Sequence, residues 1–315
     1  MNEWRWRIDR AHAGRRVDGV LRAARPDLPY AHAQRLFRKQ RVRVNRRPVA
    51  PDHRVQAGDV LSILTGQAVH VVPPNPAVRF DVLHEDRHVI VVAKPADVAM
   101  HPGKKQRTRT LVSGLLARFD RELRALGEER GYGLTHRLDA GTSGVVVVAR
   151  TAAAHANLLA QFRRRAVRKD YRALVAGEPA RAQGTVHLPL ERTERAGRTR
   201  IEVGRGGEGL TAVTEYRRLG RFGSASLLGV VPRTGRMHQI RVHLGAIGCP
   251  VLGDPLYGRA GTNEWARRRL GLERMFLHAA EITFLHPGTG RALTVTAPLP
   301  PELQAVLDRL ASAGA

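Results

Sequence analysis

The sequence has 315 residues, of which 53 are Lys or Arg and 28 are Asp or Glu, so its formal net charge is +25. Such a charge concentrates polyanions around the protein and favours nucleic acid as the partner, although an arginine-rich proteome can also use arginine as an ordinary helix former. The single cysteine, Cys249, excludes an internal disulfide or a cysteine-based zinc site, and no apolar run reaches the roughly 18 residues that span a bilayer. We therefore expect a cytoplasmic protein with no membrane partner.

The first 65 residues have the pattern of a small separate domain. Helices are predicted over 17–24 and 31–39, and two short strands follow, VRVN from Val42 and VLSIL from Val60. Basic residues crowd the second helix and the turn after it too densely to be buried, which suits contact with phosphates. They are Arg35, Arg38, Lys39, Arg41, Arg43, Arg46 and Arg47.

Residues 66–77 contain three prolines and no helical periodicity, so we expect an extended linker there. The main core is predicted over 78–315. Its expected helices are 110–119, 152–164 and one that begins at Pro301, and its expected strands include 89–93, 171–175, 211–217, 225–231, 282–285 and 293–296. The strands come in consecutive groups and do not alternate strictly with helices, which favours an α+β fold with a mixed, largely antiparallel sheet.

The segment GLTHRLDAGTSGVVVVAR, residues 133–150, places an acidic residue just before an apolar strand. Residues 142–144 form a turn that leads into the strand 145–149, so Asp139 would stand at the edge of a buried sheet on a backbone with little freedom. That position suits a catalytic group. Asp, Gly, Thr and Ser are also ordinary turn residues, however, and His136 could be a hydrogen-bonded core histidine, so the local pattern leaves both interpretations open.

Four segments in order favour the catalytic interpretation. KPADVAMHPG, HRLDAGTSG, KDYRALVAG and TGRMHQIRVHLGAIGCPVLGDPLYG resemble the sequence blocks of RluA-type pseudouridine synthases. GRRVDGVL, RLFRKQRVRVN and VQAGDVLSI resemble an S4 RNA-binding domain, which is the arrangement of the RluC subgroup. The resemblance implies an S4-like α/β RNA-binding domain over 1–65, a linker over 66–77, and a pseudouridine synthase catalytic domain with a central cleft over 78–315.

The resemblance also implies roles for single residues. Asp139 would be the catalytic carboxylate, and Arg241 the guanidinium that keeps it charged. The ring of Tyr171 would stack on the uracil while its hydroxyl takes part in proton transfer, and Arg137 would fill the space left when the uridine is flipped out. The alternatives are a surface arginine for Arg241, an aromatic on a strand face for Tyr171 and a phosphate clamp for Arg137.

Two parts of the sequence leave structural alternatives open. Around Arg241, Ile240 and Leu244 follow helical spacing and Gly248 is placed to end a helix, but Ile240 and Val242 flanking the arginine also allow a strand; the resemblance favours the helix. Residues 180–209 are rich in Arg, Gly and Glu and match no block. They are interpreted as a mobile hairpin or RNA-facing insert, or as a solvated polar loop.

A few positions depart from the usual blocks. Ala140 and Gly141 replace charged residues after HRLD, Asp97 stands where glycine is common, and Met237 where Thr or Ser is usual. None of these is an expected catalytic residue, so the departures bear on loop shape and substrate choice.

The expected reaction breaks a glycosidic bond and remakes it within one nucleotide, with no redox change and no external donor, so no cofactor is expected. His238 and His243 lack nearby carboxylate or thiolate ligands, and no metal is expected either. The resemblance implies a monomer that isomerises specific uridines in 23S ribosomal RNA. The alternatives are a transfer-RNA pseudouridine synthase and a noncatalytic RNA-binding or ribosome-assembly protein; the S4-like segment favours ribosomal RNA.

Overall fold

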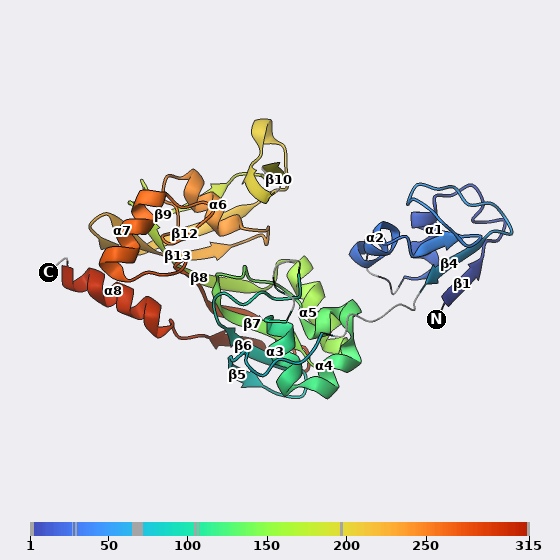
Figure 1. The fold of residues 1–315 in the computed structure, drawn as a ribbon, viewed down its shortest axis with the longest axis horizontal. Helices are drawn as coiled ribbons and strands as arrows, with labels where there is room; N and C mark the ends of the chain where they lie inside the picture. The colour runs from blue at the N-terminus through green and yellow to red at the C-terminus, as the bar shows by residue number, and fades with distance from the viewer. Residues whose placement is uncertain are drawn as a thin grey trace. The chain divides into compact units, whose positions relative to one another are not determined.

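The computed structural model describes residues 3–26, 28, 30–64, 72–103, 106, 108–195 and 198–313. The chain divides into two compact units, Met1–Val71 and Val72–Ala315, coloured blue and teal to red in Figure 1. The second unit thus begins before residue 78, and Val72 is already buried in its core. Within the described ranges, no helix is both long enough and apolar enough to cross a membrane.

The first unit packs two helices, α1 (Val17–Ala24) and α2 (Tyr30–Arg38), on a four-stranded antiparallel sheet. The strand order is β1-β4-β2-β3, and the strands are β1 (Glu3–Arg7), β2 (Val42–Val44), β3 (Arg47–Pro48) and β4 (Val60–Leu64). Val42 and Val44 point into the core and Arg43 lies between them, because successive strand side chains face opposite sides. The predicted helices and the strands β2 and β4 are present, while β1 and β3 were not predicted.

The second unit is built on a nine-stranded sheet with the order β5-β6-β7-β14-β8-β13-β12-β9, and β15 pairs with β14. All pairs are antiparallel except β7 with β14, which confirms a mixed, largely antiparallel sheet. The strands are β5 (Asp81–Glu85), β6 (Val89–Lys94), β7 (Ser143–Ala149), β8 (Arg168–Ala176), β9 (Gln183–His187), β12 (Val213–Phe222), β13 (Ala225–Pro232), β14 (Leu277–Leu285) and β15 (Ala292–Thr296).

Helices cover both faces of this sheet. They are α3 (Leu111–Arg118), α4 (Asp120–Leu126), α5 (Ala152–Arg163), α6 (Gln239–Ala246), α7 (Ala260–Leu270) and α8 (Pro301–Ala313), and Figure 1 shows α7 and α8 together at one end of the unit. Val146 and Val148 of β7 pack in one core cluster with α3, while Val145 and Val147 pack in another with α5. The strand is apolar at every position because it is buried on both faces, where each valine contributes roughly 1.5–3 kcal/mol.

The region 180–209 contains the strand β9 and a hairpin of two strands, β10 (Leu190–Arg195) and β11 (Arg198–Val203). The base of the hairpin is anchored in a small apolar cluster in which Ile201 packs with Leu190, Ala212 and Val242. The described part of the hairpin thus extends from the second unit beside α6.

Two residues fix the loop that carries Asp139. The ammonium of Lys94, at the end of β6, is buried and donates to the carbonyl oxygens of Pro95, Val98 and Ala140 at 2.7, 2.8 and 3.1 Å. Gly144 has φ +119°, and a Cβ there would lie 2.1 Å from the carbonyl oxygen of Ala279, so only glycine fits where β7 starts. The loop is therefore held from both sides.

Candidate active site

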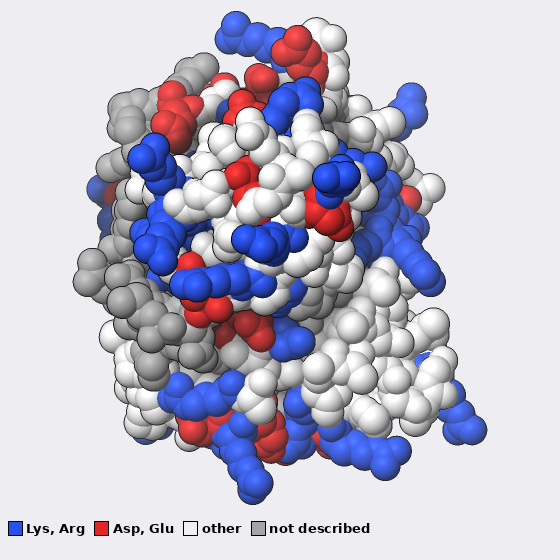
Figure 2. Space-filling model, turned by 90° about the vertical axis from the view of Figure 1, so that its right-hand side faces the viewer, with Lys and Arg blue, Asp and Glu red and all other residues white. Residues whose placement is uncertain are grey.

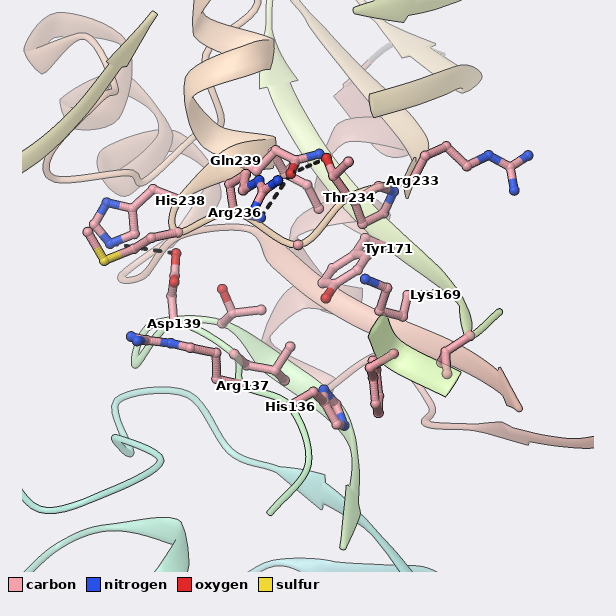
Figure 3. Close-up of a pocket in the computed structure, with 18 of the residues that line it drawn as sticks. His136, Arg137, Asp139, Lys169, Tyr171, Arg233, Thr234, Arg236, His238 and Gln239 are labelled. Carbon is pink, nitrogen blue, oxygen red and sulfur yellow. Dashed lines mark hydrogen bonds and ion pairs between the residues drawn. The ribbon is translucent and has the colours of Figure 1, made fainter. Parts of the chain in front are cut away.

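A cavity of about 430 Å³ opens between the loop before β7, the strand β8 and the start of α6. Its size lies within the range of ~300–1,000 Å³ usual for small-molecule sites. Asp139, Tyr171, Arg241 and Arg137 all line it, and Figure 3 shows Asp139 and Tyr171 facing the same space from different elements. The four predicted site residues are thus brought together in one pocket.

Arg241 bridges two carboxylates. Its Nη1 donates to Asp139 Oδ2 at 2.9 Å, and its Nε and Nη2 donate to the two oxygens of Asp254 at 2.7 and 2.8 Å. The side chain of Asp139 is 18% exposed, whereas that of Asp254 is fully buried. Arg241 is therefore fixed by a bidentate pair on its inner side and presents its remaining N–H groups toward the carboxylate at the pocket wall.

The local sequence explains where Arg241 stands. It lies in the first turn of α6, so the helical interpretation of this segment is confirmed. The side chain of Gln239 anchors that turn: it accepts from the hydroxyl of Thr234 at 2.7 Å and donates to the carbonyl of Val213 and the hydroxyl of Thr214, both at 2.9 Å. Three strand and loop partners thus set the direction in which α6 begins.

Asp254 was not singled out from the sequence, although it lies in the segment GDPLYG. Its Oδ1 also accepts from the backbone N–H groups of Leu256 and Tyr257 at 2.8 and 3.1 Å. Burial by itself would raise the pKa of Asp254, but the hydrogen bonds and charge of Arg241 and the two backbone donors outweigh it and hold the pKa below its ordinary value. The residue is an ionised counter-charge that orients Arg241.

Tyr171 lies on β8 with its side chain on the pocket side of the sheet, as does Lys169 two positions earlier. Tyr171 is buried, and burial, with the nearby charge of Asp139, raises the pKa of its hydroxyl, which stays protonated at neutral pH. Among the residues that the structure covers, the hydroxyl makes no hydrogen bond. It is available to a ligand in the pocket.

Two neighbours of Asp139 behave differently. Arg137 is exposed at the pocket mouth, with no ion pair to any described residue. His136 accepts from the backbone N–H of Val147 at 2.9 Å and stacks on Phe162 at 4.9 Å. Burial lowers the pKa of His136 to about 3, so the ring is neutral, and this hydrogen-bonded histidine is half-buried and lines the pocket.

The predicted basic residues of the first unit are mostly at the surface. Arg38, Lys39, Arg46 and Arg47 are exposed, while Arg41 and Arg43 are half-buried. The side chain of Arg35 lies outside the described residues. The exposed members lie at the end of α2 and in the β2–β3 hairpin.

The histidines His238 and His243 do not form a shared site. His243 is buried and held by the hydroxyl of Thr214 and the carbonyl of Leu188, at 2.9 and 3.0 Å, while His238 lines the pocket.

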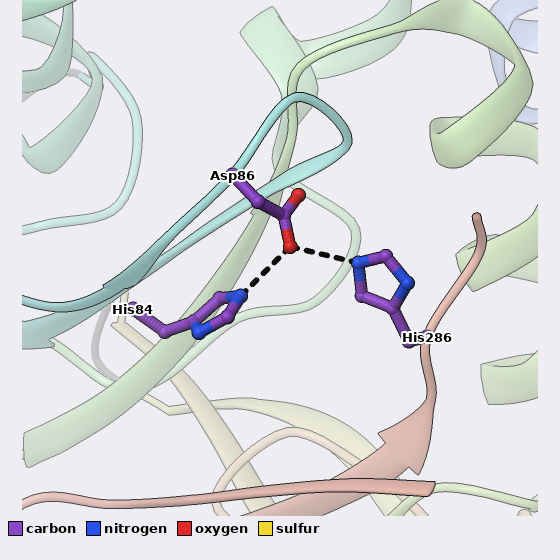
Figure 4. A group of neighbouring side chains, drawn as sticks. All are labelled: His84, Asp86 and His286. Atoms are coloured by element: carbon purple, nitrogen blue, oxygen red, sulfur yellow. Dashed lines mark hydrogen bonds and ion pairs between the residues drawn. The ribbon is translucent and has the colours of Figure 1, made fainter. Parts of the chain in front are cut away.

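A group that could hold a metal by its residue types lies elsewhere (Figure 4). The Nε2 atoms of His84 and His286 both lie 2.8 Å from Asp86 Oδ2. However, Nδ1 of His286 accepts from the backbone N–H of Thr289 at 3.1 Å, so the ring hydrogen stands on Nε2, where a metal would need the lone pair. The trio therefore ties the β5–β6 turn to the end of β14 by hydrogen bonds, and its geometry disfavours a metal.

We expect Asp86→Asn to lower the free energy of unfolding by about 2 kcal/mol, because one carboxylate accepts from both histidines and two backbone N–H groups. Added zinc should leave the melting temperature of the wild type unchanged, since a ligand that binds only the folded state would raise it. Asp81→Asn, an exposed position on β5, is the matched control. A zinc-dependent rise in melting temperature that Asp86→Asn abolishes would show a metal site instead.

Comparison with known proteins is consistent with this geometry. The family model for RNA pseudouridylate synthase matches residues 88–246, which include Arg137, Asp139, Tyr171 and Arg241. The ribosomal large subunit pseudouridine synthase C of Vibrio cholerae is 34% identical over 97% of this chain and 96% of its own. The ribosomal large subunit pseudouridine synthase D of Zymomonas mobilis is 38% identical over 77% of this chain and 78% of its own.

Among solved structures, human RNA pseudouridylate synthase domain containing 1 is similar with a TM-score of 0.58 and 29% identity, over 76% of this chain and 96% of that one. The fold, the motifs and the relatives that match nearly end to end agree with one another. The chain therefore belongs to the family of RNA pseudouridine synthases, the isomerases that convert uridine in RNA to pseudouridine.

Proposed function

We propose that this enzyme isomerises specific uridines in large-subunit ribosomal RNA, with Asp139 as its catalytic carboxylate. The observation that carries the proposal is the pairing of Asp139 with Arg241 in a pocket that also contains Tyr171. The ribosomal substrate is supported by relatives named as large-subunit ribosomal enzymes, including one that matches this chain nearly end to end.

The chemistry requires an ionised carboxylate beside the sugar. Breaking the N-glycosidic bond begins with addition at C1′ or with removal of a proton from C2′, and either step needs a nucleophile or a base. Asp139 is partly exposed to the pocket, and its Oδ2 accepts a hydrogen bond from the Arg241 guanidinium at 2.9 Å. No group from outside the nucleotide is consumed, so we propose that the reaction needs no cofactor.

Tyr171 and Arg137 complete the proposed site. The buried ring of Tyr171 offers a face for the uracil to stack on while the detached base turns, and its protonated hydroxyl can donate to the base. Arg137 is exposed beside Asp139, where a planar cation can stack in the place of the flipped nucleotide and offset the few kcal/mol that unstacking costs.

Formation of pseudouridine releases the hydrogen at uracil C5, so the direct test uses RNA labelled there with tritium. We expect the purified enzyme to release tritium from large-subunit ribosomal RNA, and we expect a deletion strain to lack pseudouridine at the sites served. Release from transfer RNA with no missing ribosomal pseudouridine would assign the substrate to the alternative class. RNA binding without release from any RNA would indicate a noncatalytic RNA-binding or ribosome-assembly role.

We also propose that the first unit is an S4-like RNA-binding domain and that the enzyme acts as a monomer in the cytoplasm. Figure 2 shows Lys and Arg side chains spread among Asp and Glu over one face of the molecule, so net charge alone does not mark the path of the RNA. The cluster at the end of α2 and in the β2–β3 hairpin is the more specific feature, because exposed cations on adjacent segments can contact neighbouring phosphates.

We expect Arg38→Gln and Arg41→Gln to weaken binding to all RNAs alike, because phosphate contacts carry no sequence information. The slope of log affinity against log salt concentration should become shallower by about one unit for each arginine–phosphate pair that the substitutions remove. Arg268→Gln removes an exposed arginine from α7, outside the first unit, and serves as the control. An unchanged slope in the Arg38 and Arg41 variants would count against contact with RNA at these positions.

A further inference from the structure

His238 connects the catalytic carboxylate to the β10–β11 hairpin through Tyr257. Its Nδ1 lies 2.8 Å from the hydroxyl oxygen of Tyr257, and that oxygen lies 3.0 Å from the backbone nitrogen of Ile201 in β11. On the other side of the ring, Nε2 lies 3.9 Å from Asp139 Oδ2, which Figure 3 marks with a dashed line. One ring nitrogen is therefore engaged by the protein, and the other faces the pocket.

The hydroxyl of Tyr257 favours the tautomer of His238 that carries its hydrogen on Nε2. A backbone N–H can only donate, so the tyrosine oxygen accepts from Ile201 and directs its own hydrogen to a second partner. Within the described part of the chain, that partner is Nδ1 of His238. Burial lowers the pKa of His238 against the opposing charge of Asp139, so the neutral ring is the relevant form and its hydrogen stands on Nε2.

The backbone of His238 is held in an uncommon conformation. It has φ 54° and ψ 15° at the start of α6, a left-handed geometry that costs a residue other than glycine of order 1–3 kcal/mol. The hydrogen bonds of Gln239 to Thr234, Val213 and Thr214 maintain this geometry from the next position in the chain. This backbone conformation directs the imidazole toward the pocket beside Asp139, where its Nε2 is available to a ligand.

The position of Nε2 indicates which substrate atom it meets. Asp139 acts at C1′ or C2′ of the ribose, and the 2′-hydroxyl is bonded to C2′. An atom at ~2.8 Å from both Nε2 and Asp139 Oδ2 is compatible with their separation of 3.9 Å. A hydroxyl oxygen can accept from Nε2–H and donate to the carboxylate at once, whereas a uracil carbonyl oxygen cannot make the second bond.

We propose that neutral His238 donates Nε2–H to the 2′-hydroxyl of the flipped uridine, and that Tyr257 is a positioning residue that fixes this tautomer. The inference rests on the proposed function, because it needs a uridine in the pocket. It assigns to one side chain the recognition of ribose over deoxyribose at the reacting nucleotide, since the 2′-hydroxyl is what distinguishes RNA from DNA there.

The test combines enzyme variants with a change in the substrate. An RNA stem that carries a uridine found by mapping the ribosomal sites is made in two forms, with ribose or with 2′-deoxyribose at that uridine alone. Single-turnover rates are then measured for the wild type, His238→Asn and His238→Gln. The amide nitrogen of Gln reaches the position of Nε2, while that of Asn reaches only the position of Nδ1. Because Asn tolerates a left-handed backbone well, we expect His238→Asn to keep the backbone conformation at the start of α6.

In the wild type we expect the ribose substrate to react faster than the deoxyribose substrate by a ratio that includes about a tenfold factor from this hydrogen bond. His238→Asn should lower that ratio about tenfold, and His238→Gln should retain most of it. Tyr257→Phe keeps the ring over Arg241 but loses the tautomer control, so it should lower the ratio by a smaller factor.

The intrinsic effect of the 2′-hydroxyl on sugar reactivity is common to all variants and cancels in the comparison. An identical ratio in the wild type and His238→Asn, with the enzyme active, would overturn the inference. No turnover of the ribose substrate by the wild type would instead reject the proposed function.

Discussion

Asp139→Asn should abolish pseudouridine formation while leaving the fold and RNA binding intact. Asparagine has the shape of aspartate but supplies neither a base nor a nucleophile, so we expect the single-turnover rate of tritium release to fall by about 10⁴-fold or more. Arg241 remains held by both oxygens of Asp254, and the pocket wall therefore keeps its geometry. The melting temperature and the RNA affinity at fixed salt should match those of the wild type.

The control for this experiment is a variant of a pocket residue with no role in the first chemical step. Arg137→Gln changes an exposed side chain next to Asp139 and should affect turnover through nucleotide flipping, with less loss on a uridine that is already unpaired than on a stacked one. Substantial turnover by Asp139→Asn would remove the catalytic assignment, whatever the other residues do.

The sequence predicts the regular elements where each has a strong local signal. The apolar run of β7 and the helical periodicity of α1 can be recognised without tertiary information. Both elements lie where these patterns predict them. The strand β1 was missed because EWRWR reads as a charged terminus, although Trp4 and Trp6 alternate with arginine as a half-buried strand requires. That signal was present in the sequence.

The site was predictable in part. The local pattern around Asp139 indicates a turn before a strand, and the turn is real: the backbone N–H of Thr142 donates to the carbonyl of Asp139 at 3.1 Å. The same local pattern is compatible with a turn alone and with a catalytic group, so the catalytic interpretation came from the family resemblance and stays a proposal. The sequence did not predict a role for Asp254, because its partner Arg241 is 13 residues away and their contact depends on how α6 packs.

His238 shows a different limit. From the sequence, His238 could be considered only as a metal ligand, and that role was rejected. Its hydrogen-bond partner Tyr257 and the backbone of Ile201 come from segments that only the fold brings together. The tautomer of a histidine depends on the hydrogen bond that its other nitrogen makes, which no spacing rule reports.

Asp254→Asn should damage both stability and turnover, in contrast to Asp139→Asn. Asp254 is fully buried, and removing its charge leaves the Arg241 cation without its bidentate partner, which costs about 3–5 kcal/mol. Because Arg241 would then no longer hold its position against Asp139, we expect turnover to fall by about 10²-fold. Urea denaturation and single-turnover rates measure the two effects.

The pH dependence of the loss follows from the same pair. The pKa of Asp254 lies below its ordinary value, so its contribution to stability is fully present above the unfolded value of about 3.9 and is lost as the pH falls through the lower folded value. The stability difference between the wild type and Asp254→Asn should therefore shrink in acid.

A second substitution separates the buried charge from the catalytic geometry. Removing both charges in Arg241→Met/Asp254→Asn eliminates the cation that has lost its bidentate partner, and the double variant should be more stable than Asp254→Asn alone. It should still be as inactive as the less active of the single variants, since no guanidinium then lies beside Asp139. Recovery of turnover together with stability would mean that Asp254 supports the fold only and that Arg241 is not needed beside the catalytic carboxylate.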